Sequence, residues 1–162
     1  MLPMVTVKDV PGQLMVEKLS EVLKQYEELK PPEWAKFIKT NPANERPPDE
    51  PVEVWWYKRV ASVLRRVYLL GPIGLSRLRK YYGGTKRRRH GMRKRHKVKG
   101  SGKLLRYILQ QLEKAGLIQW VDSPRKGRAI TKKGKELLDK VAEEVAKEYY
   151  KGEPKISLEV KL

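Results

Sequence analysis

The feature that most constrains this chain is a stretch without any acidic residue, from residue 54 to residue 112. This acid-free stretch contains 18 Lys and Arg residues, whereas the rest of the 162-residue chain has 19 basic and 19 acidic residues, which cancel. The whole net charge of +18 therefore lies in this stretch. Self-repulsion on that scale destabilises a compact state unless a polyanion neutralises it. The pattern therefore predicts nucleic acid as the binding partner.

Length and composition exclude several classes of protein. A chain of 162 residues is typical of one domain, and we expect it over residues 1–150, followed by a charged tail at 151–162. The sequence has no cysteine, so disulfides, Cys-ligated zinc, iron–sulfur clusters and thiol catalysis are excluded. No apolar run approaches the ~20 residues of a membrane helix, and the N-terminus lacks a secretory pattern. We expect an intracellular protein without a membrane partner.

The spacing of apolar residues predicts a mainly helical chain. A helix that Asp9 caps is expected from about residue 10 to the Pro31-Pro32 pair, with Leu29 on its apolar face. The other predicted helices cover residues 33–40 (presenting Trp34, Phe37 and Ile38), 54–70, 74–82, 101–115 and about 18 residues after Thr131. Residues 118–121 and 128–130 flank a turn and are typical of a β-hairpin. Residues 85–102 lack an apolar period, which predicts a long basic loop, and residues 155–160 alternate like an edge strand.

The order of these elements is that of a winged helix-turn-helix. The predicted fold class is mainly α, with a winged helix-turn-helix core, a short two-stranded β-hairpin wing and additional N-terminal helices. The helix at 101–115 is the recognition-like helix, and its predicted outer face holds Lys103, Arg106, Tyr107, Gln110, Gln111 and Lys114. The long basic loop fits the irregular crevices of folded RNA better than duplex DNA.

The candidate RNA-binding residues are cations, chiefly arginines, because the planar guanidinium grips phosphate in a bidentate manner and stacks on bases. They come from the basic side of the central helix, the basic loop and the recognition-like helix. The predicted set is Lys58, Arg59, Arg65, Arg66, Arg87, Arg88, Arg89, Arg93, Lys94, Arg95, Lys99, Lys103 and Arg106. For any single member, a solvated or locally paired charge is an equally good interpretation.

The tryptophan, tyrosine and histidine side chains of the acid-free stretch each allow a functional and a structural interpretation. Trp55 lies among the cations of the central helix and could stack on a base, but Trp is usually largely buried, so packing is favoured. Tyr81, Tyr82 and Tyr107 are expected in the core or half-buried rather than stacked on bases. His90 and His96 lie six residues apart without Cys or acidic neighbours, so we expect no metal site and no cofactor. The acid-free stretch offers no carboxylate for general acid–base catalysis, and we expect no enzyme and no small-molecule substrate.

Several motifs resemble the small-subunit ribosomal protein S19e family of archaea and eukaryotes. The matching segments are VWWYKRVAS at 54–62, GPIG at 71–74, YGG at 82–84, KGSG at 99–102, LQQLE at 109–113 and GRAITKKG at 127–134. The resemblance covers about residues 4–147, whereas the tail has no counterpart and the basic loop is richer in Arg and His. It implies a winged-helix RNA-binding protein in the head of the small subunit, whose eukaryotic members are required for maturation of the rRNA precursor. Positions that match important family residues are Trp55, Arg59, Arg65 or Arg66, and Arg106, with Gly127 serving the fold.

The expected partners are therefore small-subunit rRNA and neighbouring small-subunit ribosomal proteins. We expect the free chain to be a monomer and the protein to be located in the cytoplasm, as part of the ribosome. Two alternatives remain open from the sequence. A winged-helix transcriptional regulator would bind duplex DNA, usually as a dimer on paired half-sites. A protein–protein adaptor would present the same basic surface to an acidic partner.

Overall fold

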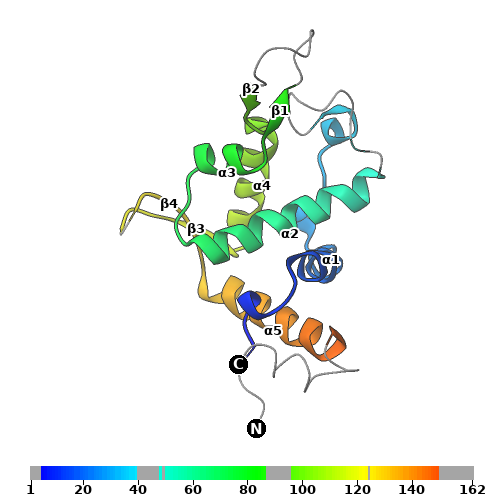
Figure 1. The fold of residues 1–162 in the computed structure, drawn as a ribbon, viewed down its shortest axis with the longest axis vertical. Coiled ribbons are helices and arrows are strands. Elements are labelled where there is room, and N and C mark those ends of the chain that lie inside the picture. The colour runs from blue at the N-terminus through cyan, green and yellow to red at the C-terminus, as the bar shows by residue number, and fades with distance from the viewer. Residues whose placement is uncertain (1–4, 40–47, 49, 87–95, 124, 150–162) are drawn as a thin grey trace.

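The structure, a computed structural model, describes residues 5–39, 48, 50–86, 96–123 and 125–149. Within these residues helices predominate and two antiparallel hairpins project from them (Figure 1). The α helices are α1 (Gly12–Leu23), α2 (Val52–Leu70), α3 (Leu75–Tyr81), α4 (Gly102–Lys114) and α5 (Lys132–Tyr149), with 3-10 turns η1 (Val7–Asp9), η2 (Glu27–Leu29) and η3 (Glu33–Phe37). The strands are β1 (Gly84–Lys86), β2 (His96–Val98), β3 (Ile118–Val121) and β4 (Gly127–Ile130). None of the described helices is both long and apolar enough to cross a bilayer.

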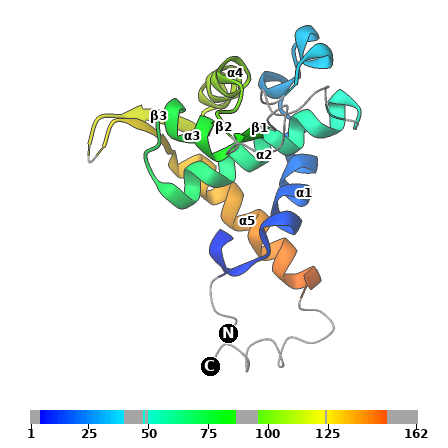
Figure 2. The same ribbon diagram turned by 45° about the horizontal axis from the view of Figure 1, so that its top comes forward.

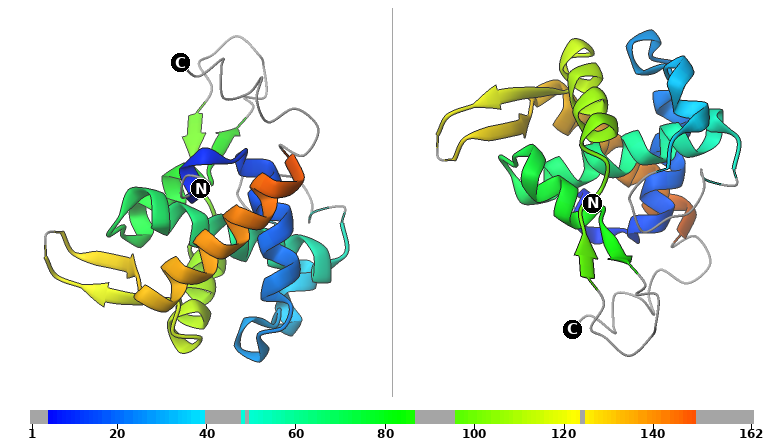
Figure 3. Two further views of the ribbon diagram at one scale, coloured as in Figure 1. Left: turned by 90° about the horizontal axis from the view of Figure 1, so that it is seen from below. Right: turned by 90° about the horizontal axis from the view of Figure 1, so that it is seen from above.

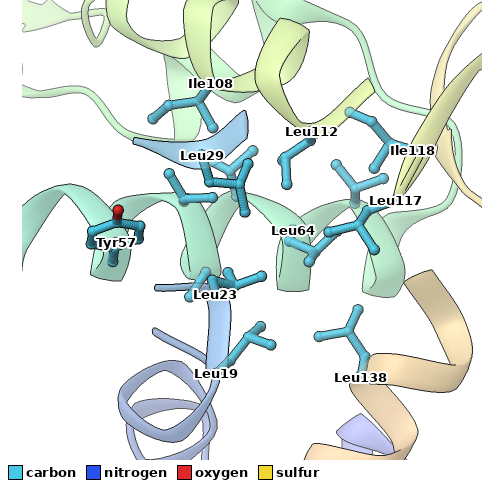
Figure 4. Packing of buried hydrophobic residues seen from close by; sticks show 14 of the residues in the cluster. Leu19, Leu23, Leu29, Tyr57, Leu64, Ile108, Leu112, Leu117, Ile118 and Leu138 are labelled. Carbon is cyan, nitrogen blue, oxygen red and sulfur yellow. The ribbon is translucent and has the colours of Figure 1, made fainter. Parts of the chain in front are cut away.

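Helix α2 is the centre of the molecule, because α1, α4 and β4 all pack against it, while α5 packs mainly on α1 (Figure 2). Leu64 of α2 meets Leu19 of α1, Leu112 of α4 and Leu138 of α5 in one continuous apolar core (Figure 4). All four side chains are fully buried, and each such burial contributes about 1.5–3 kcal/mol. The core thereby fixes which side of α2 is left for the polar side chains.

The winged-helix arrangement is confirmed. Helices α2, α3 and α4 are followed by the β3–β4 hairpin, whose register pairs Ile118 with Ile130. Ile73, between α2 and α3, joins this wing through two backbone hydrogen bonds with Arg128, of 3.1 and 3.0 Å. Gly127 has a φ of +155°, and a Cβ there would lie 2.8 Å from the Ile73 backbone, so this close approach requires glycine.

The prediction of a basic loop over the whole of residues 85–102 is wrong at both ends. Strands β1 and β2 form an antiparallel ladder in which Gly84 pairs with Val98 and Lys86 with His96. Backbone hydrogen bonds hold such a hairpin whatever its side chains are, so an apolar period is not needed to form it. The predicted RNA contacts Arg87, Arg88, Arg89, Arg93, Lys94 and Arg95 lie outside the described residues, as do His90 and the tail at 151–162.

The N-terminal helices are shorter than predicted. Helix α1 begins after Pro11 and ends at Leu23, and Leu29 is buried from the separate turn η2. Asp9 does not cap α1: its carboxylate accepts hydrogen bonds from the backbone and side chain of Thr6 within η1. The expected helix at 33–40 is the turn η3, which ends at Phe37. Phe37 therefore does not join the core and is 81% exposed.

Candidate nucleic-acid interface

Four predicted cations on α2 form one surface, which we call the α2 cation stripe: Lys58, Arg59, Arg65 and Arg66. The opposite side of the helix is held in the core, so these side chains face the start of α1 and the end of α3. In Figure 3 the start of α1 and the β1–β2 hairpin lie on the same side of the molecule, away from the end of α4. All four side chains are half-buried rather than extended into solvent.

Arg59 is held against Tyr82 at the end of α3. Its guanidinium carbon lies 4.5 Å from the centre of the Tyr82 ring, a cation–π contact. The Tyr82 hydroxyl lies 2.6 Å from Ser62 Oγ, which fixes the ring on α2. Burial lowers the pKa of Arg59, but a guanidinium remains charged in proteins. Burial raises the pKa of Tyr82, which favours the protonated hydroxyl.

Arg66 makes the same kind of contact with Tyr81, the last residue of α3. Its guanidinium carbon lies 3.5 Å from the centre of the Tyr81 ring, and Tyr81 is 51% exposed. Burial is the main reason why the pKa of Arg66 is lowered, but a guanidinium remains charged at neutral pH. The two tyrosines, which are edge-to-face at 5.0 Å, thus orient two of the four cations.

The charge of the stripe is poorly compensated by the protein. Lys58 forms an ion pair with Glu50 at 3.1 Å. No described carboxylate lies within ion-pair distance of Arg59, Arg65 or Arg66. Positive charges that are half-buried and unpaired carry a desolvation cost, which a bound anion offsets. The arrangement is therefore suited to binding phosphate groups.

The predicted cations on and before α4 lie in a different setting. Lys99, Lys103 and Arg106 are exposed, and Ser101 caps α4 by accepting a hydrogen bond from the Leu104 backbone. The Lys103 ammonium lies 4.6 Å from the centre of the Trp34 ring in η3. Lys103 thus lies on the η3 side of α4, whereas the α2 cation stripe lies beside α1 and α3.

The outer face predicted for α4 is partly covered, and the placement of Gln111 on that face is wrong. Tyr107 packs edge-to-face on Trp34 at 5.3 Å and is half-buried. Gln111 is only 6% exposed and donates a hydrogen bond of 2.6 Å to the Lys30 carbonyl. The segment that carries η2 and η3 packs over this part of α4. The two segments are far apart in the sequence, so the local pattern of residues does not predict their contact.

Trp55 is 8% exposed and packs edge-to-face on Trp56 at 5.8 Å, which agrees with the favoured packing interpretation. The ring is therefore not available as a stacking platform in this structure. The aromatic residues that do meet the stripe, Tyr81 and Tyr82, were expected only as core or half-buried residues. No signal in the sequence identifies their arginine partners, because these contacts join two helices.

The described residues contain no group of three or more His, Cys, Asp or Glu side chains that could hold a metal ion. His96 lies in β2. The stripe and α4 offer cations and aromatic rings, which bind anions and bases.

Comparison of the sequence with known proteins identifies the family of the chain. The family model described as ribosomal protein S19e matches residues 6–148. The chain is similar to small ribosomal subunit protein eS19 of Aeropyrum pernix, with 43% identity over 94% of this chain and 97% of that protein. It is similar to eS19 of Haloarcula marismortui, with 41% identity over 86% and 90%. It is also similar to eS19A of Saccharomyces cerevisiae, with 37% identity over 91% and 99%.

Proposed function

Since the chain belongs to the ribosomal protein S19e family, we propose that it binds small-subunit rRNA in the subunit head and supports subunit assembly and rRNA maturation. It acts as a structural ribosomal protein, not as an enzyme, in the cytoplasmic ribosome. Its partners are rRNA and neighbouring ribosomal proteins. Residues 1–150 act as one RNA-binding unit, and the free chain is a monomer.

The observation that carries the proposal is the lack of carboxylate partners for Arg59, Arg65 and Arg66 among the described residues. Arg59 and Arg66, which are held against Tyr82 and Tyr81, form a cationic surface together with Arg65 in a chain with a net charge of +18. Phosphates at a junction of rRNA helices supply the missing negative charge. The contact is structural: it neutralises repulsion between RNA strands and needs no chemical step.

The packing of the η2–η3 segment over part of α4 favours RNA over duplex DNA as the bound nucleic acid. A winged helix that reads DNA lays its recognition helix in the major groove with several side chains reaching base edges. Here Tyr107 and Gln111 are turned into contacts with Trp34 and Lys30. The remaining exposed cations, Lys103 and Arg106, suit phosphate contacts. RNA recognition by shape and phosphate position needs no open recognition helix.

Sedimentation of a native lysate through a sucrose gradient tests the proposal. We expect the protein to co-migrate with the small subunit and to lose that position after RNase treatment. Migration as a free dimer that selects duplex DNA would instead support a transcriptional regulator. Retention on an acidic protein after RNase treatment would support an adaptor.

Binding to purified small-subunit rRNA gives a second, quantitative test. We expect the logarithm of affinity to fall steeply and linearly with the logarithm of salt concentration, with a slope set by the number of phosphates neutralised. A flat salt response would contradict the phosphate-contact mechanism even if the protein is in the ribosome.

A further inference from the structure

A cleft of about 420 Å³ opens between the start of α1, the middle of α2 and the end of α3. Its lining includes Gly12 and Glu17 of α1, Lys58, Arg65 and Arg66 of α2, and Tyr81 of α3. This volume is within the roughly 300–1,000 Å³ typical of small-ligand pockets. The cleft is thus large enough for a group that projects into it, beyond what a flat phosphate contact needs.

Arg65 is the strongest indication of a ligand in this cleft. None of the described groups accepts a hydrogen bond from its guanidinium, and its Nε is buried without any partner. The terminal nitrogens of the guanidinium are not buried with Nε and have no partner among the described groups, so they can donate hydrogen bonds to an acceptor in the cleft. The Glu17 carboxylate in the lining does not supply it, since no ion pair joins Glu17 to a described cation.

The other side chains that line the cleft indicate which kind of hydrogen-bond acceptor can bind there. Lys58, which also pairs with Glu50, and Arg66 add positive charge to that of Arg65, against the single carboxylate of Glu17 in the lining, so the cleft favours a group with negative charge. Tyr81, half-exposed and backed by the Arg66 guanidinium at 3.5 Å, provides an aromatic wall beside them. A phosphate attached to a flat base satisfies both requirements, because unpaired bases stack on aromatic rings and guanidinium planes.

We propose that this cleft receives a single unpaired nucleotide of the bound RNA, with its phosphate on Arg65 and Lys58 and its base against Tyr81. The inference rests on the proposed RNA-binding function and specifies the RNA element at this site. A paired nucleotide has its base inside the duplex and cannot enter a cleft, whereas bulged or looped nucleotides are free to project.

Gly12 keeps the cleft open. A Cβ at this position would lie 2.9 Å from the terminal nitrogen of Arg65, so any side chain here displaces the guanidinium. The displaced group is the far end of a flexible side chain, and the fold tolerates such a change. Gly12→Val therefore narrows the cleft and moves Arg65 without removing any charge.

Photo-crosslinking of the full chain to small-subunit rRNA, followed by mass spectrometry and mapping of the crosslinked nucleotide, tests the proposal. We expect a crosslink at Tyr81 to a nucleotide that is unpaired in the rRNA secondary structure. Gly12→Val should abolish this crosslink and keep those on α4. Gly74→Ala is the matched control, because a Cβ at Gly74 meets nothing within 4 Å, and it should keep the Tyr81 crosslink.

Affinity measurements separate this inference from the proposed function. Arg65→Gln should weaken rRNA binding about tenfold, the loss expected for one charge-assisted contact. The remote Lys140→Gln, an equal loss of charge on α5, should change it less than about twofold. Crosslinks on α4 without one at Tyr81, or a Tyr81 crosslink to a paired nucleotide, would overturn the nucleotide cleft and leave the RNA-binding function intact. Failure of wild-type protein to bind rRNA at all would overturn both.

To distinguish a free nucleotide from an RNA element, the crosslinking is repeated with adenosine monophosphate as competitor. We expect no loss of the Tyr81 crosslink at millimolar competitor, because neighbouring phosphate contacts hold the RNA nucleotide at high effective concentration. Full displacement together with tight binding of the mononucleotide would contradict the proposal and indicate a small-molecule site.

Discussion

The two basic regions of the molecule differ in how their cations are held. The α2 cation stripe is half-buried between α1 and α3, and tyrosine rings orient Arg59 and Arg66. On α4, Lys103 and Arg106 are exposed, and the Trp34 ring lies beside Lys103. Both regions lie in the same acid-free stretch and look alike in sequence.

The difference teaches that similar charge supports two kinds of contact. Oriented guanidinium groups have already lost side-chain freedom, so binding costs them less entropy and their positions select a matching phosphate arrangement. Exposed flexible cations attract RNA from a distance, and salt screens them strongly. We therefore expect the stripe to determine affinity and fit, and α4 to assist mainly by long-range attraction.

The largest expected effect comes from reversing two charges in the stripe. Arg59→Glu with Arg65→Glu should reduce rRNA affinity by about 100-fold or more, since two charge-assisted contacts of roughly 1.5–3 kcal/mol each are lost. It should also prevent incorporation into the small subunit. Filter binding and gradient sedimentation measure these outcomes, and circular dichroism should show an unchanged helical signal.

Because both arginines are half-buried, glutamate at these positions can destabilise the fold. A second double variant with neutral side chains is therefore needed as a control. Arg59→Gln with Arg65→Gln removes the charges without introducing carboxylates into the space beside Tyr82. We expect a stable protein that binds rRNA weakly. If both double variants unfold, the two arginines are structural and the stripe is not the main RNA contact.

The matched reversal on α4 should have a smaller effect. Lys103→Glu with Arg106→Glu should weaken binding about tenfold near physiological salt and reduce the salt slope by about two. The check is a salt titration of affinity for both double variants. An α4 loss equal to the stripe loss at every salt concentration would remove the distinction between the two regions.

The smallest effect on RNA concerns Tyr68, which is also half-buried on α2 but faces α5. Its hydroxyl donates a hydrogen bond of 2.7 Å to Asp139. Burial, and then this bond, raise the pKa of Tyr68 from 10.0 to about 12. The folded state thus holds this proton more tightly than the unfolded state, and the resulting stability is present below pH 10 and lost as the pH rises towards 12.

Tyr68→Phe should therefore make the free energy of unfolding fall less steeply between pH 10 and 12 than it does in the wild-type protein. Its rRNA affinity at neutral pH should equal that of wild type. Denaturant titrations across the alkaline range measure the first quantity. A loss of RNA affinity would mean that burial on α2, and not the stripe itself, governs binding.

Local patterns predicted much of the architecture. The apolar spacing of residues 54–70 and 101–115 anticipated α2 and α4, because a 3.6-residue period is needed to reach a core from one side of a helix. The turn at residues 122–127 anticipated the wing. The pattern did not anticipate β1 and β2, whose pairing depends on backbone hydrogen bonds. It also overextended α1, which ends at Leu23 while Leu29 enters the core from a separate turn.

What the sequence by itself determined is the location of charge and the order of elements: one acid-free stretch, and helices that produce a winged-helix core. The tertiary structure alone decided the surroundings of each cation. It placed Tyr81 on Arg66, Gly12 beside Arg65 and Trp34 beneath Lys103. The physical reason is range: periodicity and charge are properties of neighbouring residues, whereas burial, cation–π contacts and a cleft arise where distant segments pack together.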